Sequence, residues 1–139
     1  MNINLLNEAQ IDYIVNFQEA KYHDLGWLWT ALDSLEKFPD KIANLNENFS
    51  TKKDIFFVLL EYLMLNNELK LAKNNEILRI EPSIILSEFQ SIFPKSEEDV
   101  QELGGVQIWL VMNSDEYCPF WPIWVDTDVN GKEKLWWAD

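Results

Sequence analysis

The spacing of apolar residues changes after Gly105, and that change constrains the fold more than any other feature. Before Gly105 the apolar side chains recur at intervals of three and four residues, which is typical of amphipathic helices. After Gly105 they alternate with a period of two, which is typical of strands. Helices first and an antiparallel sheet last predict an α+β fold, with four or five N-terminal helices packed on a small C-terminal antiparallel sheet. We expect residues 1–139 to form a single domain, since that length suits one hydrophobic core.

Two helices are predicted before Pro39. Asn7 and Gln10 have the spacing of a capping box, and the apolar face that follows them extends to about Tyr22. Gly26 interrupts the pattern, and a second apolar face then runs to the proline. We assign the tryptophans of this helical stretch to the core.

The strongest helical pattern follows a polar loop at residues 40–49. Thr51 and Asp54 have the spacing of a second capping box, directly before a long apolar run. Two short β-like stretches flank Asn74-Asn75 and predict a small hairpin. Pro82 then suits the first turn of a fourth helix.

A short acidic helix, residues 97–103, precedes the change of period. Residues 106–112 and 121–125 then alternate β-forming residues and are predicted as strands. Asn130-Gly131 is a strong hairpin signal, and residues 135–138 are the expected return strand.

The last third of the chain combines negative charge with aromatic side chains. Residues 97–139 hold ten acidic residues and two basic ones, whereas the preceding 96 residues hold 14 and nine. Five of the seven tryptophans lie in the same part: Trp109, Trp121, Trp124, Trp136 and Trp137. The net charge of −13 opposes binding to nucleic acid and to anionic membranes. It predicts a basic protein partner instead.

Six residues are predicted to bind that partner. Carboxylates raise the rate of encounter with a basic protein, and buried indoles slow its release. The predicted steering residues are Asp115, Glu116, Asp126 and Asp128, and the predicted anchors are Trp121 and Trp124. Of the adjacent pair Trp136 and Trp137, at least one should face away from the helices, because neighbours in a strand point to opposite faces.

We predict no metal ion and no cofactor. Residues 126–131 match the opening of a calcium loop, but the twelfth position, which needs a glutamate, is Trp137. A hairpin turn explains the segment without a metal. His23, the single histidine, is expected at a helix end near Gly26, where it would compensate the helix dipole. Cys118 follows two acidic residues, and we expect it to be a packed cysteine rather than a nucleophile.

The sequence lacks the local motifs of common enzymes, so enzymatic activity is not predicted. It has no phosphate-binding glycine loop, no Cys-x-x-Cys pair and no Gly-x-Ser-x-Gly elbow. Two alternatives stay open: a binding module for a sugar-like small ligand on an aromatic sheet face, and a divalent-metal-dependent hydrolase using Asp126 and Asp128. Residues 1–11 lack the features of a signal peptide, and the longest apolar run, residues 55–60, is too short to span a bilayer. We therefore expect a cytoplasmic protein.

Several short stretches resemble the bacterial family called domain of unknown function 596. They cover about the last two-thirds of the chain and are framework residues rather than a catalytic signature. The matching stretches are residues 53–61, 68–73 and 93–98, Cys118-Pro119, Trp124-Val125 and residues 131–136. The family pattern has glycines after Cys118-Pro119, where this chain has Phe120-Trp121-Pro122.

The resemblance implies a role but assigns no functional residue. Members of the family are similar to small proteins encoded beside secreted or contact-dependent toxins. This implies an immunity protein, which would neutralise a basic toxin domain, such as a nuclease, by covering its surface. The oligomeric state is not predicted.

Overall fold

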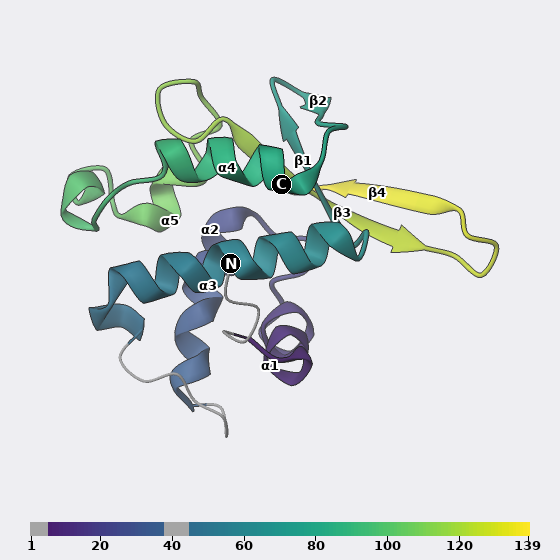
Figure 1. Cartoon of the computed structure of the whole chain (residues 1–139), viewed down its shortest axis with the longest axis horizontal. Helices are drawn as coiled ribbons and strands as arrows, with labels where there is room; N and C mark the ends of the chain where they lie inside the picture. The colour runs from purple at the N-terminus through teal and green to yellow at the C-terminus, as the bar shows by residue number, and fades with distance from the viewer. Residues whose placement is uncertain (1–5, 38–44) are drawn as a thin grey trace.

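The computed structural model describes residues 6–37 and 45–139 and shows an α+β fold (Figure 1). The predicted fold class is confirmed. The helices are α1 (Glu8–Asp12), α2 (Leu25–Ala31), α3 (Phe49–Leu65), α4 (Pro82–Ile92) and α5 (Val106–Trp109). A π-helical turn, η1 (Tyr13–Phe17), continues α1, and three 3₁₀ turns are η2 (Leu32–Lys37), η3 (Leu45–Glu47) and η4 (Glu98–Val100). The strands are β1 (Leu69–Lys73), β2 (Glu76–Ile77), β3 (Phe120–Thr127) and β4 (Glu133–Trp137).

The four strands form one antiparallel sheet in the order β2-β1-β3-β4. Each half is a hairpin, and the two halves join where Leu71 of β1 lies opposite Pro122 of β3. The predicted hairpin at Asn74-Asn75 is confirmed, and both asparagines have positive φ, as a type I′ turn requires. Helices α4 and α5 separate the two hairpins in the sequence.

Aromatic side chains from α3, α4 and β3 form the centre of the core. Phe57 lies edge-on to Phe89, with ring centroids 5.2 Å apart, and Phe89 stacks on Phe120 at 4.7 Å. These contacts hold α4 against the sheet. Trp29 of α2 extends the cluster through an edge contact with Phe56 at 5.4 Å. Among the described residues no helix is both long and apolar enough to cross a membrane.

The first helix is shorter than predicted. The capping box is confirmed: the Gln10 backbone N–H donates to Asn7 Oδ1, and the Asn7 backbone N–H donates to Gln10 Oε1, both at 2.8 Å. The helical turns end at Phe17 rather than near Tyr22. The physical reason is that Glu19 and Tyr22 have positive φ, which a right-handed helix does not allow.

Helix α3 begins earlier than the predicted capping box. Its N-cap is Asn48, whose side-chain oxygen accepts a hydrogen bond from the Thr51 backbone N–H at 3.1 Å. Thr51 is therefore already inside the first turn. At the other end Asn66 is the C-cap and Asn67 has positive φ, so the strand that follows starts in a new direction.

The predicted strand at residues 106–112 is wrong, because this segment forms the short helix α5. The backbone N–H of Leu110 donates to the carbonyl of Val106 at 2.9 Å, a helical bond. The buried residues are Val106, Trp109 and Leu110, which have helical spacing despite their high β-propensity. Gly105, at φ +99°, turns the chain into this helix.

The hairpin of β3 and β4 projects beyond the helices (Figure 1). The predicted return strand is confirmed, with Val125 opposite Leu135. The turn is longer than a two-residue Asn-Gly turn: Asp128 Oδ1 accepts the backbone N–H groups of Asn130 and Lys132, at 2.8 and 2.9 Å. Every residue of β4 is exposed.

Candidate functional site

The structure separates the predicted steering residues into two groups. Asp115 and Glu116 precede β3, whereas Asp126 and Asp128 lie at its far end. β3 runs from Phe120 to Thr127, and its seven residue steps correspond to a length of about 23 Å. A typical partner covers about 800 Å² of a protein surface. A footprint of that size can be centred on one of the two groups but not on both.

Asp126 is held by groups of the same chain. Its carboxylate pairs with Lys21 Nζ at 3.0 Å, and its Oδ2 accepts hydrogen bonds from the Tyr22 hydroxyl at 2.7 Å and from Trp136 Nε1 at 2.8 Å. The hydrogen bond from Tyr22, followed by that from Lys21, lowers the pKa of Asp126. Its charge is therefore largely neutralised within the hairpin.

Asp128 has a local role in the turn. Its side chain accepts the two turn N–H groups described above, which accounts for the resemblance of this segment to a calcium loop. No group of three or more metal-ligating side chains is found in the two described ranges, residues 6–37 and 45–139. The arrangement gives a metal-dependent hydrolase at Asp126 and Asp128 no support.

The two predicted tryptophan anchors have structural contacts. Trp124 is 0% exposed, and its Nε1 donates to the His23 carbonyl at 2.8 Å, so its side chain cannot reach a partner in this conformation. The prediction that Trp124 anchors a partner is wrong, because its face of β3 packs into the core. Trp121 is half-buried, and its Nε1 donates to the carbonyl of Ala138 at 2.7 Å. This hydrogen bond connects Ala138, which follows β4, to β3.

Charge and exposed indoles are also distributed differently from the prediction. The segment 97–116, here called the acidic end, has six exposed acidic residues and no basic one: Glu97, Glu98, Asp99, Glu102, Asp115 and Glu116. The hairpin end comprises the β3–β4 hairpin with Lys21 and Tyr22. Its three bases, Lys21, Lys132 and Lys134, balance its three acids, Asp126, Asp128 and Glu133. Figure 1 shows α5 and the loop leading into β3 at the end of the molecule opposite the hairpin.

An exposed indole does share a groove with a carboxylate, that of Asp24, but it is Trp27. The helical pattern of the sequence predicts this residue in the core, whereas the structure shows it 45% exposed on α2. The His23 ring stacks on it with centroids 4.0 Å apart and planes 8° apart, and Trp27 Nε1 donates to the Gln18 carbonyl at 3.2 Å. These two contacts hold the indole in one orientation.

The spacing along α2 contained a signal for this exposure. Trp27 shares a helix face with Thr30, Ala31 and Ser34, at intervals of three, four and seven residues, and all of them line one groove. None of these neighbours is large and apolar, so this face is not the buried one. His23 precedes the N-cap Asp24 rather than following a helix, so its predicted role at a helix C-terminus is wrong.

Three adjoining hollows meet at Gln107, and we call them together the Gln107 surface. The first is an apolar groove of about 510 Å³ between α2 and α5, lined by Trp27, Ile108 and Val111 among others. The second, of about 560 Å³, is bounded by Glu97, Glu98 and the glycines before α5. The third, of about 300 Å³, lies over Trp29. Gln107 lines all three.

Close packing of α2 and α5 creates this surface. Gly26 lies in the first turn of α2, where a Cβ atom would be 2.4 Å from the Gln107 carbonyl oxygen. Only glycine permits that approach. The side chain of Glu97 also fixes α5, because its Oε2 accepts the Val106 backbone N–H at 3.3 Å.

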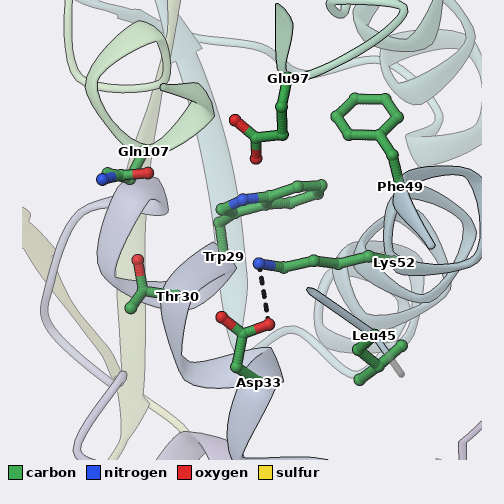
Figure 2. Close-up of a pocket in the computed structure, with 8 residues that line it drawn as sticks. All are labelled: Trp29, Thr30, Asp33, Leu45, Phe49, Lys52, Glu97 and Gln107. Carbon is green, nitrogen blue, oxygen red and sulfur yellow. Dashed lines mark ion pairs between the residues drawn. The ribbon is translucent and has the colours of Figure 1, made fainter. Parts of the chain in front are cut away.

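The hollow over Trp29 contains a buried ammonium group. Lys52 is 7% exposed, its Nζ lies 3.0 Å from Asp33 Oδ1, and it sits 4.4 Å from the centre of the Trp29 ring. The contact with Asp33 is an ion pair without hydrogen-bond geometry. Figure 2 shows Lys52 on one side of the Trp29 ring and Glu97 on the other. Sequence reasoning did not identify this pair, since nothing local distinguishes Lys52 from an exposed lysine.

The Gln107 surface is negatively charged. Its lining includes four carboxylates, those of Asp24, Asp33, Glu97 and Glu98, and one ammonium group, that of Lys52. Because Lys52 pairs with Asp33, the other three carboxylates are not balanced by a base in the lining. The surface therefore suits a basic group next to an apolar one.

Cys118 is a packed residue, as predicted, but for a different reason. Its side chain is fully buried, and this burial raises the pKa of the thiol to about 12. The neighbouring acidic residues are exposed and are not the cause. A thiol with that pKa is a poor nucleophile near neutral pH.

Comparisons with known proteins agree with the fold. An uncharacterised protein conserved in bacteria, from Neisseria meningitidis, has a similar structure, with a TM-score of 0.65 and 21% sequence identity over 91% of this chain and 87% of that one. At that identity the likeness concerns the fold alone. No curated protein matches the chain. The pattern described as "Protein of unknown function, DUF596" matches residues 64–138, more than half of the sequence, and the chain therefore belongs to that family.

Proposed function

We propose that this chain is a binding protein of the immunity type, which captures a basic protein at the Gln107 surface. The observation that carries the proposal is the fixed, exposed indole of Trp27 on a surface whose carboxylates Asp24, Glu97 and Glu98 have no balancing base in the lining. An aromatic anchor next to charge of one sign is the arrangement expected of a surface that attracts a partner and then retains it.

The two components have different effects on binding. Carboxylates such as Glu97 and Glu98 raise the association rate with a basic protein, by about 10 to 10³-fold at low ionic strength. Exposed ion pairs each contribute only about 0–1 kcal/mol to affinity, whereas a buried aromatic anchor contributes about 2 kcal/mol or more. The ring of Trp27 is already oriented, so little rotamer entropy is lost on binding.

Neutralisation follows from occupying the basic surface of the partner. A nuclease toxin domain binds phosphates in a cationic groove, and an acidic protein seated there excludes nucleic acid. The net charge of −13 and the family resemblance support this form of the proposal.

The test begins with the product of the gene next to the one that encodes this chain. Its binding is measured by surface plasmon resonance with wild type and with Trp27→Ala. The matched control is Trp137→Ala, because Trp137 is exposed to nearly the same extent, 43%, at the hairpin end. We expect Trp27→Ala to raise the dissociation rate about 30-fold and the control to leave it unchanged. A greater effect of Trp137→Ala than of Trp27→Ala would place the contact elsewhere.

A second pair of variants tests the electrostatic part. Glu97→Gln/Glu98→Gln should lower the association rate about tenfold at 20 mM salt and leave it unchanged at 500 mM. Glu76→Gln/Glu81→Gln, which removes the same charge from β2 and the start of α4, is the control. If the adjacent gene product is toxic, co-expression of wild type should restore growth. Binding without relief of toxicity would contradict the immunity role.

The small-ligand alternative was predicted on an aromatic sheet face, but the groove that supports it lies beside Trp27, between helices α2 and α5. A volume of about 510 Å³ is within the range of small-molecule sites. A sugar-like ligand there would change the fluorescence of Trp27 with little dependence on salt. A basic protein partner would show strong salt dependence, which separates the two functions.

A further inference from the structure

We propose that β4 pairs with β4 of a second copy of this chain, antiparallel, to form a continuous eight-stranded sheet. This pairing involves the hairpin end and is independent of the function proposed for the Gln107 surface. It rests on the unpaired main chain of β4, on its sequence, and on the local balance of charge.

The hydrogen-bond pattern shows which main-chain groups of β4 bond to β3 and which point outward. At one end of the hairpin, the Ala138 N–H donates to the Pro122 carbonyl at 3.2 Å; at the other, the Asp128 N–H donates to the Lys132 carbonyl at 2.9 Å. Bonded and non-bonded pairs alternate in an antiparallel ladder, so even-numbered residues of β4 bond to β3. The N–H and C=O groups of Glu133, Leu135 and Trp137 therefore point away from the sheet.

This edge has only part of the protection that edge strands usually have, because β4 is short and its one lysine, Lys134, is accompanied by a residue of opposite charge, Glu133. β4 contains no proline, and β4 is the last strand in the sheet order. Two of its side chains, Leu135 and Trp137, lie on one face and are 37% and 43% exposed. A strand with free outward groups and exposed apolar side chains is a template for another strand.

The sequence of β4 is complementary to itself in one register. Outward-facing residues must lie opposite outward-facing residues, and the register with greatest overlap places Leu135 opposite Leu135 of the second copy. Lys134 then lies opposite Trp136 of the second copy, where an ammonium can contact an indole face. Lys134 already does so within the chain, at 4.2 Å from the Trp136 ring centre.

Charge favours a second copy over a basic segment of another protein. The hairpin end has three acids and three bases, so it presents no net charge to attract a basic strand. The same balance removes local repulsion between copies. In this register the start of β3, next to the acidic end, lies five residue steps from the two-fold axis in each copy. The acidic ends would therefore lie at least about 35 Å apart, which far exceeds the screening length of about 8 Å at physiological salt.

A five-residue strand pair is a small interface, so the dimer belongs to the weak class. Light scattering coupled to size exclusion should show the mass rising from 16.4 kDa toward twice that value as the concentration increases from about 5 to 500 µM. A constant mass of 16.4 kDa over that range would overturn the proposal.

Charge exchange at Leu135 tests the register. Leu135→Lys and Leu135→Glu each place like charges opposite one another, and each should weaken the dimer at least about 100-fold. An equal mixture of the two variants should dimerise again, because opposite charges then face each other. Thermal unfolding of each variant checks that it remains folded. Val129→Lys, at the exposed hairpin tip outside the strand, is the control and should dimerise as wild type does.

Two further outcomes would contradict the proposal. If the mixture stays monomeric while each variant is folded, residue 135 does not lie on the two-fold axis. If wild type is monomeric but Leu135→Pro, which removes an outward N–H, abolishes binding of another protein, the edge pairs with that protein instead.

Discussion

The Gln107 surface and the hairpin end both expose tryptophan, but the surroundings of those indoles differ. At the Gln107 surface Trp27 adjoins carboxylates that have no balancing base in the lining. At the hairpin end Trp136 contacts Lys134 and bonds to Asp126, which pairs with Lys21. Under the two proposals, indoles of similar exposure therefore have different partners: a basic protein at the first site and a neutral strand at the second.

The two regions are joined at His23. Its carbonyl accepts the hydrogen bond of the buried Trp124, and its ring stacks on Trp27. Trp124 of β3 thus holds His23, and His23 in turn orients the Trp27 ring. Changes at this joint should affect both regions, whereas changes beyond it should affect only one.

The largest effect is expected at the joint. Trp124→Ala removes a fully buried indole and leaves the His23 carbonyl without its donor, so it should lower the free energy of unfolding by about 3–5 kcal/mol. Trp136→Ala, directly opposite in the sheet but 40% exposed, should lower it by about 1 kcal/mol. Urea denaturation followed by circular dichroism measures both. Similar losses of unfolding free energy in the two variants would contradict the prediction that burial makes Trp124 more important for stability than Trp136.

An intermediate effect is expected where α2 meets α5. Gly26→Ala introduces a Cβ atom against the Gln107 carbonyl and should lower the free energy of unfolding by about 1–3 kcal/mol. Gly131→Ala, at φ +79° with no atom within 4 Å of its added Cβ, should cost only the backbone strain, about 1 kcal/mol. If Gly26→Ala lowers the free energy of unfolding no more than Gly131→Ala does, then α2 and α5 do not approach each other as closely at Gly26 as the structure shows.

The smallest effect is a pH dependence confined to the hairpin end. The pKa of Asp126 is lowered by its hydrogen bonds, so its contribution to stability is present above about pH 4 and is lost as the pH falls through the folded pKa. The hydrogen bond to Asp126 raises the pKa of Tyr22, so that contribution is present below about pH 10 and is lost as the pH rises through the folded value.

Melting curves of wild type and Asp126→Asn between pH 3 and 11 test this. The difference in stability should be constant from about pH 5 to 9 and should shrink on both sides. A difference that does not change with pH would mean that the hydrogen bonds of Asp126 do not stabilise the folded hairpin.

Local patterns of residues predicted most elements of the fold. The capping box at Asn7, the hairpin at Asn74-Asn75 and the proline that opens α4 each act within a few residues, and each is confirmed. The predicted strand at residues 106–112 is wrong because contacts from elsewhere in the chain place these β-forming residues. Gly26 packs on the backbone of the segment, and Glu97 accepts the N–H of Val106. Propensity does not include those contacts.

The amino-acid sequence by itself determined the α+β class, the excess of negative charge and the concentration of indoles. These are properties of composition and short-range spacing. The tertiary structure decided which carboxylates are paired and which indoles are exposed. Asp126 lies near Lys21 only because β3 passes the loop before α2, more than 100 residues away in the chain. Trp27 and Trp124 differ in exposure because packing, rather than residue type, determines which side chain reaches the surface.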